Sequence, residues 1–512
     1  MVAIALNGLF RKHAVAEQKL TGNELVRKFG ISPVRLPIEA HDVQGLVFRG
    51  YGKLHAACYP LLAIEDPART RRWLEELASR TTSGILSPSV DTAIHVAFTY
   101  RGLMTLETPP SLLQGFSQEF IEGMAGTHHN GTGLSHRNRF LGDEGESAPG
   151  HWQWGGPSTR EIHLALLLYA KDARRLESLL EDLRSSWKTA GLAHIRTLET
   201  HPLTENAREH FGFSDGISQP AIEGYHPASS PLHRVKAGEF ILGYENEYGL
   251  HAERPLIPAS DDPFGLLPLD FEGSPLHDAG RNGTYLVIRQ LQQDVPKFRD
   301  TLQRLTRHPD GAENIDAQAR LAAKMVGRWP SGAPLIEAPD DDNPDKARSN
   351  DFRYHRDDPE GLRCPLGAHV RRANPRDALD PSPGTDRSLH INHRHRILRR
   401  GRIYGTPLPP GETDDKDRGL IFIAVNANIR RQFEFIQHSW IADSQFNGFF
   451  GESDPIVGTL ASNRFSVPGD PLRSRYTGLP RFVTTAGGAY FFMPGRRALA
   501  FLAKSLRDGG ER

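Results

Sequence analysis

One pattern recurs four times along this chain of 512 residues: an apolar run, then Asp or Asn, then an amphipathic helix. In the first copy the apolar run ends at Ile64, Asp66 is placed to cap a helix, and Pro67 occupies the first helical position. The capping residues of the other three copies are Asp172, Asp294 and Asn428. Each copy therefore predicts a strand that leads into a capped helix.

The arrangement of these copies predicts an α+β fold. Further strands are expected at 92–100, 193–200, 396–404 and 489–493. Two strand–helix units per half, each followed by a strand, fit the split βαβ arrangement of a ferredoxin-like domain. A doubly wound α/β domain uses the same units, but the gaps between them are too long and loop-rich for a compact parallel sheet. We therefore predict two ferredoxin-like domains with antiparallel sheets, at residues 1–225 and 226–512.

Charge and composition exclude several classes of protein. The 62 Lys and Arg balance the 62 Asp and Glu, and no basic block stands out, so neither nucleic acid nor an anionic membrane is an expected partner. Apolar runs such as Leu164–Ala170 are shorter than the ~18 residues of a membrane span, and the first residues do not resemble a signal peptide. The only two cysteines, Cys58 and Cys364, predict reduced thiols and a cytoplasmic location.

The segment FGFSDGISQP at 211–220 allows two kinds of chemistry. Gly212 to Gly216 match G-x-S-x-G, the nucleophile elbow of serine hydrolases, but the preceding residues are polar and Pro220 interrupts the helix that should follow. Alternatively, the glycines on either side of Asp215 let a tight turn expose its carboxylate in apolar surroundings, where it can act as a general acid–base. An ordinary Asx turn explains the same residues.

The segment RCPLGAHVRRANPRD at 363–377 contains a histidine that a bulky group could approach. His369 follows the small residues Gly367 and Ala368, so a metal or haem ligand is possible as well as a structural role. The arginines beside it suit carboxylates or phosphates; they are Arg371, Arg372 and Arg376.

The segment RILRRGRIYG at 396–405 reads as a strand with paired arginines. Arg399 and Arg400 point to opposite faces of such a strand, so at most one can reach a buried site. An arginine in that place can stabilise negative charge as it develops. A solvated basic edge strand is the alternative.

Together these segments resemble the dye-decolorising peroxidases, a family of haem-b peroxidases. GFSDG looks like the family's GxxDG motif, CPLGAHVRRANPR like its proximal-histidine segment, and ILRRGRIYG like its distal-arginine strand. GLIFIAVNANIRRQFEFIQHSW and FVTTAGGAYFFMP are similar to its last strand–helix unit and closing strands. The resemblance runs in order from about residue 40 to 505, and the family's pair of ferredoxin-like domains agrees with the duplication.

The resemblance implies one haem b per chain, held mainly by the C-terminal half, with His369 as the axial ligand of the iron. Asp215 would be the distal acid–base and Arg399 the distal arginine, with Arg400 as the alternative register. Hydrogen peroxide would be reduced, and dyes, phenols or other organic donors oxidised in one-electron steps. The resemblance further implies that the propionates contact Arg371 and Arg372 and that Leu420 and Phe422 line the distal pocket. The candidates for passing electrons from bulky dyes are Trp152, Trp154, Trp187, Trp329 and Tyr404.

Two other classes of function remain open. A protein that binds or handles haem without turnover would share His369 but need neither Asp215 nor Arg399. A non-haem metal site could use the loop histidines, although their spacing matches no zinc signature. These histidines are His128, His129, His136 and His151. The sequence leaves the oligomeric state open.

Overall fold

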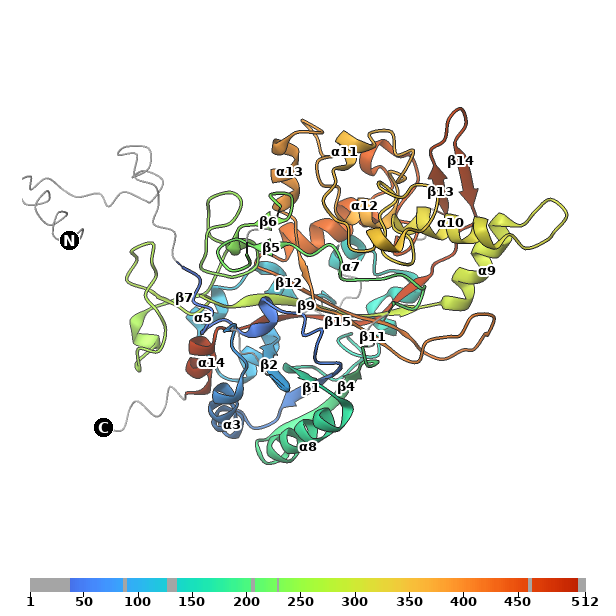
Figure 1. The fold of residues 1–512 in the computed structure, drawn as a ribbon. Helices are drawn as coiled ribbons and strands as arrows, with labels where there is room; N and C mark the ends of the chain where they lie inside the picture. The colour runs from blue at the N-terminus through green and yellow to red at the C-terminus, as the bar shows by residue number, and fades with distance from the viewer. Residues whose placement is uncertain are drawn as a thin grey trace, which may run out of the picture.

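The computed structural model describes residues 37–85, 90–126, 136–203, 208–227, 230–458 and 463–504, and within them nine strands form one sheet with antiparallel pairing (Figure 1). The strands of the N-terminal half are β1 (Ala56–Ile64), β2 (Thr92–Phe98), β3 (Leu164–Ala170) and β4 (Leu192–Glu199). Those of the C-terminal half are β9 (Thr284–Gln293), β10 (Leu398–Arg399), β11 (Arg402–Tyr404), β12 (Gly419–Asn426) and β15 (Val483–Met493). Short two-stranded sheets are formed by β5 (Ala221–Ile222) with β6 (Arg234–Val235), β7 (Leu256–Ile257) with β8 (His277–Asp278), and β13 (Arg464–Val467) with β14 (Ser474–Thr477).

The two halves of the sheet have the same strand order. The N-terminal half runs β4-β1-β3-β2, and the C-terminal half runs β15-β9-β12 and then β10 with β11. In each half the last strand therefore lies beside the first, as in a ferredoxin-like unit, and the predicted α+β duplication is confirmed. The two units are not separate sheets, because β15 pairs with β2 at Phe492 and Phe98 and so covers two edges that would otherwise be exposed. The boundary at residue 225 stays a prediction.

All four predicted capping residues cap the segments that follow them. Asp66, Asp172 and Asp294 accept hydrogen bonds from backbone amides at 3.0, 2.9 and 3.0 Å. They begin the helices α3 (Pro67–Arg80), α8 (Ala173–Thr189) and α9 (Val295–Thr306). Asn428 likewise accepts from the Arg431 amide at 2.8 Å, but the segment it opens is π-helical, as η7 (Arg430–Glu434) and η8 (Ile436–Ala442). A wider helical turn of this kind is typical of functional sites.

The helices cover the two halves of the sheet differently. In the N-terminal half, α3, α8 and α14 (Arg496–Ala503) pack on one face, where Leu74, Trp187 and Leu499 belong to one hydrophobic cluster with strand residues such as Leu62. The long excursion between β9 and β12 lies over the C-terminal half (Figure 1). It contains α10 (Ile315–Val326), α11 (Tyr354–Asp357), α12 (His369–Ala373) and α13 (Asp386–His393). The remaining short helices are α4 (Tyr100–Thr105), α5 (Pro110–Gln114), α6 (Gln118–Glu122) and α7 (His136–Leu141).

Alternation along β12 separates a core face from a cavity face. Ile421 and Ile423 belong to a hydrophobic cluster that runs along one face of the whole sheet. Leu420 and Phe422 point to the other face, under the excursion, and both line a cavity there. Among the described residues, no helix is both long enough and apolar enough to cross a membrane.

Candidate active site

A cavity of about 310 Å³ lies between the C-terminal half of the sheet and the excursion above it. Its walls bring together residues that are far apart in the sequence. Those predicted from the sequence that line it are Asp215, His369, Arg376, Arg399, Leu420 and Phe422. A cavity of this size, with apolar walls and a few converging polar groups, is typical of ligand sites.

The turn that carries Asp215 depends on its two glycines. Gly212 and Gly216 have φ of +101° and +80°, a conformation that side chains disfavour. Phe213 between them is buried, and the Gly216 amide donates to Asp215 Oδ1 at 2.5 Å. The hydroxyl of Ser214 donates to the Pro330 carbonyl at 3.2 Å, and no helix follows the turn. This geometry does not support a serine nucleophile.

Asp215 and Arg399 form an ion pair inside the cavity, with Nη1 to Oδ1 at 3.0 Å. The side chain of Asp215 is 47% exposed because it faces the open cavity. Partial removal from solvent acts to raise the pKa of Asp215, but the charge of Arg399 and the bond from Gly216 hold this pKa below its ordinary value. The carboxylate is therefore ionised over most of the pH range.

Arg400 points to the opposite face of the sheet from Arg399. Its guanidinium donates to the carbonyls of Leu46 and Val47, both at 2.8 Å. The predicted strand at 396–404 is interrupted between β10 and β11, where a Cβ at Gly401 would meet the Ile421 carbonyl at 2.4 Å. Of the two registers left open by the sequence, the structure has the one with Arg399 in the cavity.

His369 begins α12 and is held by a buried carboxylate. Its Nδ1 lies 2.8 Å from Oδ2 of Asp454, whose side chain is fully buried. The other oxygen, Oδ1, accepts from the amides of Ile456 and Val457 at 2.8 and 2.9 Å. Burial lowers the pKa of His369, but the charge and hydrogen bond of Asp454 outweigh it and raise this pKa overall. Because Nδ1 is engaged, Nε2 is the nitrogen available to a ligand.

Arg371 and Arg372 do not line the cavity, contrary to the propionate role implied for them. Arg371 donates to Cys364 O at 2.8 Å and to Asp358 Oδ2 at 3.2 Å, and it is 2% exposed. Arg372 donates to the carbonyls of Trp440 and Glu452 at 2.7 and 3.1 Å. The Nη atoms of Arg371 and the guanidinium of Arg372 donate to buried carbonyls and a carboxylate outside the cavity, so these two arginines hold the excursion together.

Two other arginines supply positive charge to the cavity instead. Arg376 donates to the carbonyls of Asn350 and Phe352, both at 2.7 Å, and its Nε has no partner among the described residues. Arg396 makes one long contact, of 3.5 Å, to the Ser218 carbonyl. Burial lowers the pKa of Arg396 to about 9, and the charges of Arg376 and Arg399 contribute to this. These buried cations lack ion-pair partners among the described carboxylates, so the cavity favours an anionic ligand.

Comparison with known proteins shows the family to which this chain belongs. No protein-family model matches the chain. A dye-decolorising peroxidase of Mycena epipterygia is 30% identical over 473 residues, which cover 83% of this chain and 78% of the relative. The chain belongs to the dye-decolorising peroxidase family. It is therefore a peroxidase, an oxidoreductase that uses peroxide.

Further relatives agree with this assignment. A multifunctional dye peroxidase of an Amycolatopsis species is 31% identical, over 69% of this chain and 73% of its own. A solved dye-decolorising peroxidase in complex with 2,6-dimethoxyphenol superposes with a TM-score of 0.72 at 25% identity, over 91% of this chain and 100% of its own. The enzyme of Auricularia auricula-judae gives the same TM-score, identity and coverage. The family's fold is thus present over nearly the whole chain.

The aromatic residues considered as electron relays of this dye-decolorising peroxidase are all buried. Trp154 and Trp187 are 1% exposed, and Tyr404 is 8% exposed with its hydroxyl donating to Asp417 at 2.8 Å. Trp152 and Trp329 are 4% exposed. None of them is a surface residue, so a relay through any of them stays a prediction.

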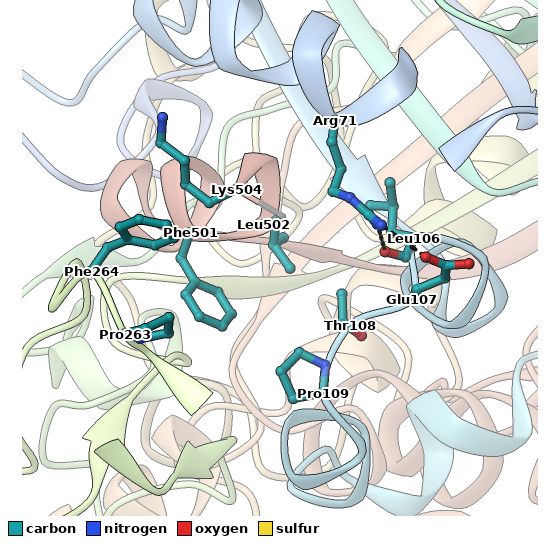
Figure 2. A pocket seen from close by; sticks show the side chains of 10 residues that line it. All are labelled: Arg71, Leu106, Glu107, Thr108, Pro109, Pro263, Phe264, Phe501, Leu502 and Lys504. Carbon is teal, nitrogen blue, oxygen red and sulfur yellow. Dashed lines mark hydrogen bonds and ion pairs between the residues drawn. The ribbon is translucent and has the colours of Figure 1, made fainter. Parts of the chain in front are cut away.

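Among the described residues, neither a metal cluster nor the small pocket beside α3 and α14 competes with the cavity in this peroxidase. His128 and His129 lie outside the described residues, and the described part of the chain has no group of three or more His, Cys, Asp or Glu that could hold a metal. A pocket of about 20 Å³ lies between α3, α14 and neighbouring loops (Figure 2). Its Arg71 pairs with Glu107 at 2.9 Å, its Lys504 pairs with Glu75, and its floor is apolar. Both of these cations are already neutralised, so this pocket offers no reactive group.

Proposed function

We propose that this peroxidase binds one haem b, reduces hydrogen peroxide, and oxidises dyes, phenols or other organic donors in one-electron steps. The observation that carries the proposal is the convergence of two side-chain pairs on one cavity. One pair is an imidazole held by a buried carboxylate, His369 with Asp454, and the other is Asp215 with Arg399. A protein that only stores or carries haem needs the first pair and not the second.

The residues of the cavity fit haem. His369 would bind the iron through Nε2, while Asp454 fixes the imidazole ring and makes it a better electron donor. The unpaired charges of Arg376 and Arg396 would hold the two propionates, and Leu420 and Phe422 would contact the macrocycle. Haem would supply the iron that binds peroxide and the oxidising equivalents that are later passed to the donor.

Asp215 and Arg399 would divide the remaining chemistry. Reduction of peroxide requires a proton to move from one peroxide oxygen to the other, so that the second oxygen leaves as water. The ionised carboxylate of Asp215 can take this proton and return it. The guanidinium of Arg399 orients Asp215 and stabilises the negative charge that develops as the O–O bond breaks.

Absorption spectroscopy with haem titration tests this function. Protein produced with haem supplied should show a Soret band and bind one equivalent of haem, and its spectrum should change on addition of peroxide. The same sample should oxidise 2,6-dimethoxyphenol and an anthraquinone dye only when peroxide is present. A colourless preparation that binds no added haem would overturn the proposal.

The pair of His369 and Asp454 leads to a prediction about haem retention. In Asp454→Asn, the amide group must face either the backbone amides of Ile456 and Val457 or the Nδ1–H of His369, and all of these are donors. We expect haem affinity to fall by about 10- to 100-fold. The measurement is the rate of haem transfer to an apoglobin scavenger.

Asp443→Asn is the matched control. Among the described residues, this carboxylate accepts a hydrogen bond only from the nearby Gln445 amide, at 2.9 Å, and does not contact His369. Haem release at the wild-type rate in Asp454→Asn would show that the imidazole needs no carboxylate partner.

A further inference from the structure

Glu209 closes the turn that carries Asp215. Its Oε1 accepts from the Phe213 amide at 2.8 Å, and its Oε2 accepts from the Phe211 amide at 3.0 Å. The backbone of Glu209 also bonds across the turn, donating to the Phe213 carbonyl at 2.9 Å and accepting from the Gly212 amide at 2.8 Å. One residue therefore fixes the backbone that leads directly into Asp215.

The same carboxylate ties this turn to the sheet. Gln293, the last residue of β9, donates to Glu209 Oε2 at 2.6 Å. Arg289 and Leu291 of β9 line the cavity, as does Glu209 itself. The position of Asp215 relative to the cavity wall thus depends on a hydrogen bond between two side chains that the family's GxxDG pattern does not include.

These contacts favour the ionised form of Glu209. All three of its hydrogen-bond partners are N–H donors, and a carboxylate accepts from them more strongly than a protonated carboxyl group does. Burial raises the pKa of Glu209, and the charge of Asp215 adds to this, while the three hydrogen bonds oppose it. Because the pKa of Asp215 is lowered, Glu209 takes up its proton first as the pH falls.

We propose that Glu209 is a positioning residue for Asp215, and that its protonation, and not that of Asp215, sets the acid limit of the reaction with peroxide. The inference rests on the proposed role of Asp215. The charged groups and histidines that line the cavity together with Glu209 are Asp143, Asp215, Arg289, Arg328, His369, Arg376, His395, Arg396, Arg399 and Arg481. Among the described residues Glu209 forms no ion pair with any of these cations, and its carboxylate bonds to two backbone amides and to Gln293.

Two substitutions shift the acid limit in opposite directions. Glu209→Gln removes the group that titrates, so the acid limb of the peroxide rate should move to lower pH by about half a unit or more. The rate on the plateau should fall by about tenfold to a hundredfold, because one turn hydrogen bond is lost and Asp215 is displaced. Gln293→Leu keeps the carboxylate but removes a donor that favours its ionised form, so the acid limb should move to higher pH.

Stopped-flow rates with peroxide from pH 2.5 to 7 measure both effects, and spectra of the loaded protein monitor the haem environment. Glu199→Gln is the control. Glu199 lies at the end of β4 and does not line the cavity, and partial burial raises its pKa as well. This variant should leave the pH profile unchanged. If Glu209→Gln does not fold, the movement of the acid limb to higher pH in Gln293→Leu still shows whether Glu209 sets the acid limit. Lower rates in both variants with an unmoved acid limb would overturn the proposal in favour of a purely structural role.

Asp215→Asn, measured alongside, separates this inference from the proposed function. A wild-type peroxide rate in Asp215→Asn would remove the acid–base role itself. Loss of the rate in Asp215→Asn, together with wild-type rates and acid limits in Glu209→Gln and Gln293→Leu, would overturn only the inference about Glu209.

Discussion

Asp215→Asn is expected to slow the reaction with peroxide by about 10²- to 10⁴-fold, the range that a positioned general acid–base contributes. Asparagine keeps the size of the side chain and can still contact Arg399, which lies 3.0 Å from the carboxylate. It cannot take a proton from one peroxide oxygen and return it to the other. The substitution therefore removes the chemistry while it preserves the shape of the cavity.

The pH dependence of Asp215→Asn sharpens the test. Burial acts to raise the pKa of Asp215, but Arg399 and the Gly216 amide hold it below its ordinary value of about 3.9. The carboxylate is therefore still ionised in mildly acidic solution, and the variant should be slow at every pH instead of showing a shifted optimum. Stopped-flow spectroscopy at several pH values measures this.

The control for Asp215→Asn is Asp182→Asn. Asp182 is also paired with an arginine, Arg80 at 2.6 Å, but on the surface of the N-terminal half. The variant Asp182→Asn should react with peroxide at the wild-type rate. If Asp215→Asn also kept that rate, proton transfer would have to be assigned elsewhere, and Arg399 would be the next residue to test.

His369→Ala is expected to abolish stable haem binding. The substitution removes the proposed iron ligand and leaves Asp454 buried without its imidazole partner. The purified variant should lack a Soret band, while its far-UV circular dichroism should stay close to that of the wild type. Added imidazole should restore part of the haem binding, because the substitution leaves a space in which Asp454 can hold the free ring.

His151→Ala is the control for haem loss. His151 is an exposed loop histidine that does not line the cavity, and it belongs to the set considered for a non-haem metal site. The variant His151→Ala should keep its haem. Retention of a normal Soret band by His369→Ala would mean that another side chain binds the iron, and the assignment of α12 as the proximal segment would be wrong.

The parts of the fold that depend on local chemistry were predictable from the sequence. Asp66, Asp172, Asp294 and Asn428 each cap the segment after them, because a cap is decided within four residues of the chain. The duplicated strand order follows from the repetition of these units. The π-helical form of the fourth segment could not be predicted from the sequence, because its apolar spacing also suits an α-helix.

The parts of the site that depend on long-range packing were not predictable. Asp454 lies 85 residues beyond His369, and nothing near either residue indicates the pair. Arg371 and Arg372 stand close to His369 in the sequence, yet the turn of α12 directs them into backbone carbonyls. Of the three arginines beside His369 that are candidates for binding an anion, only Arg376 lines the cavity, and Arg396, which was not a candidate, lines it as well. Motif spacing thus identifies the central residues of the site but not the residues that support them.

The place of β15 in the sheet has a consequence for how this enzyme is made. Among the described residues only α14 follows this strand, yet the strand lies in the interior of the sheet, where it pairs with β9 along its length and with β2 at Phe492. A ribosome that has released only the first 480 residues has produced every residue of the cavity named in the proposed mechanism, but not the strand that joins the two halves. The two halves can therefore dock fully only after β15 has left the ribosome.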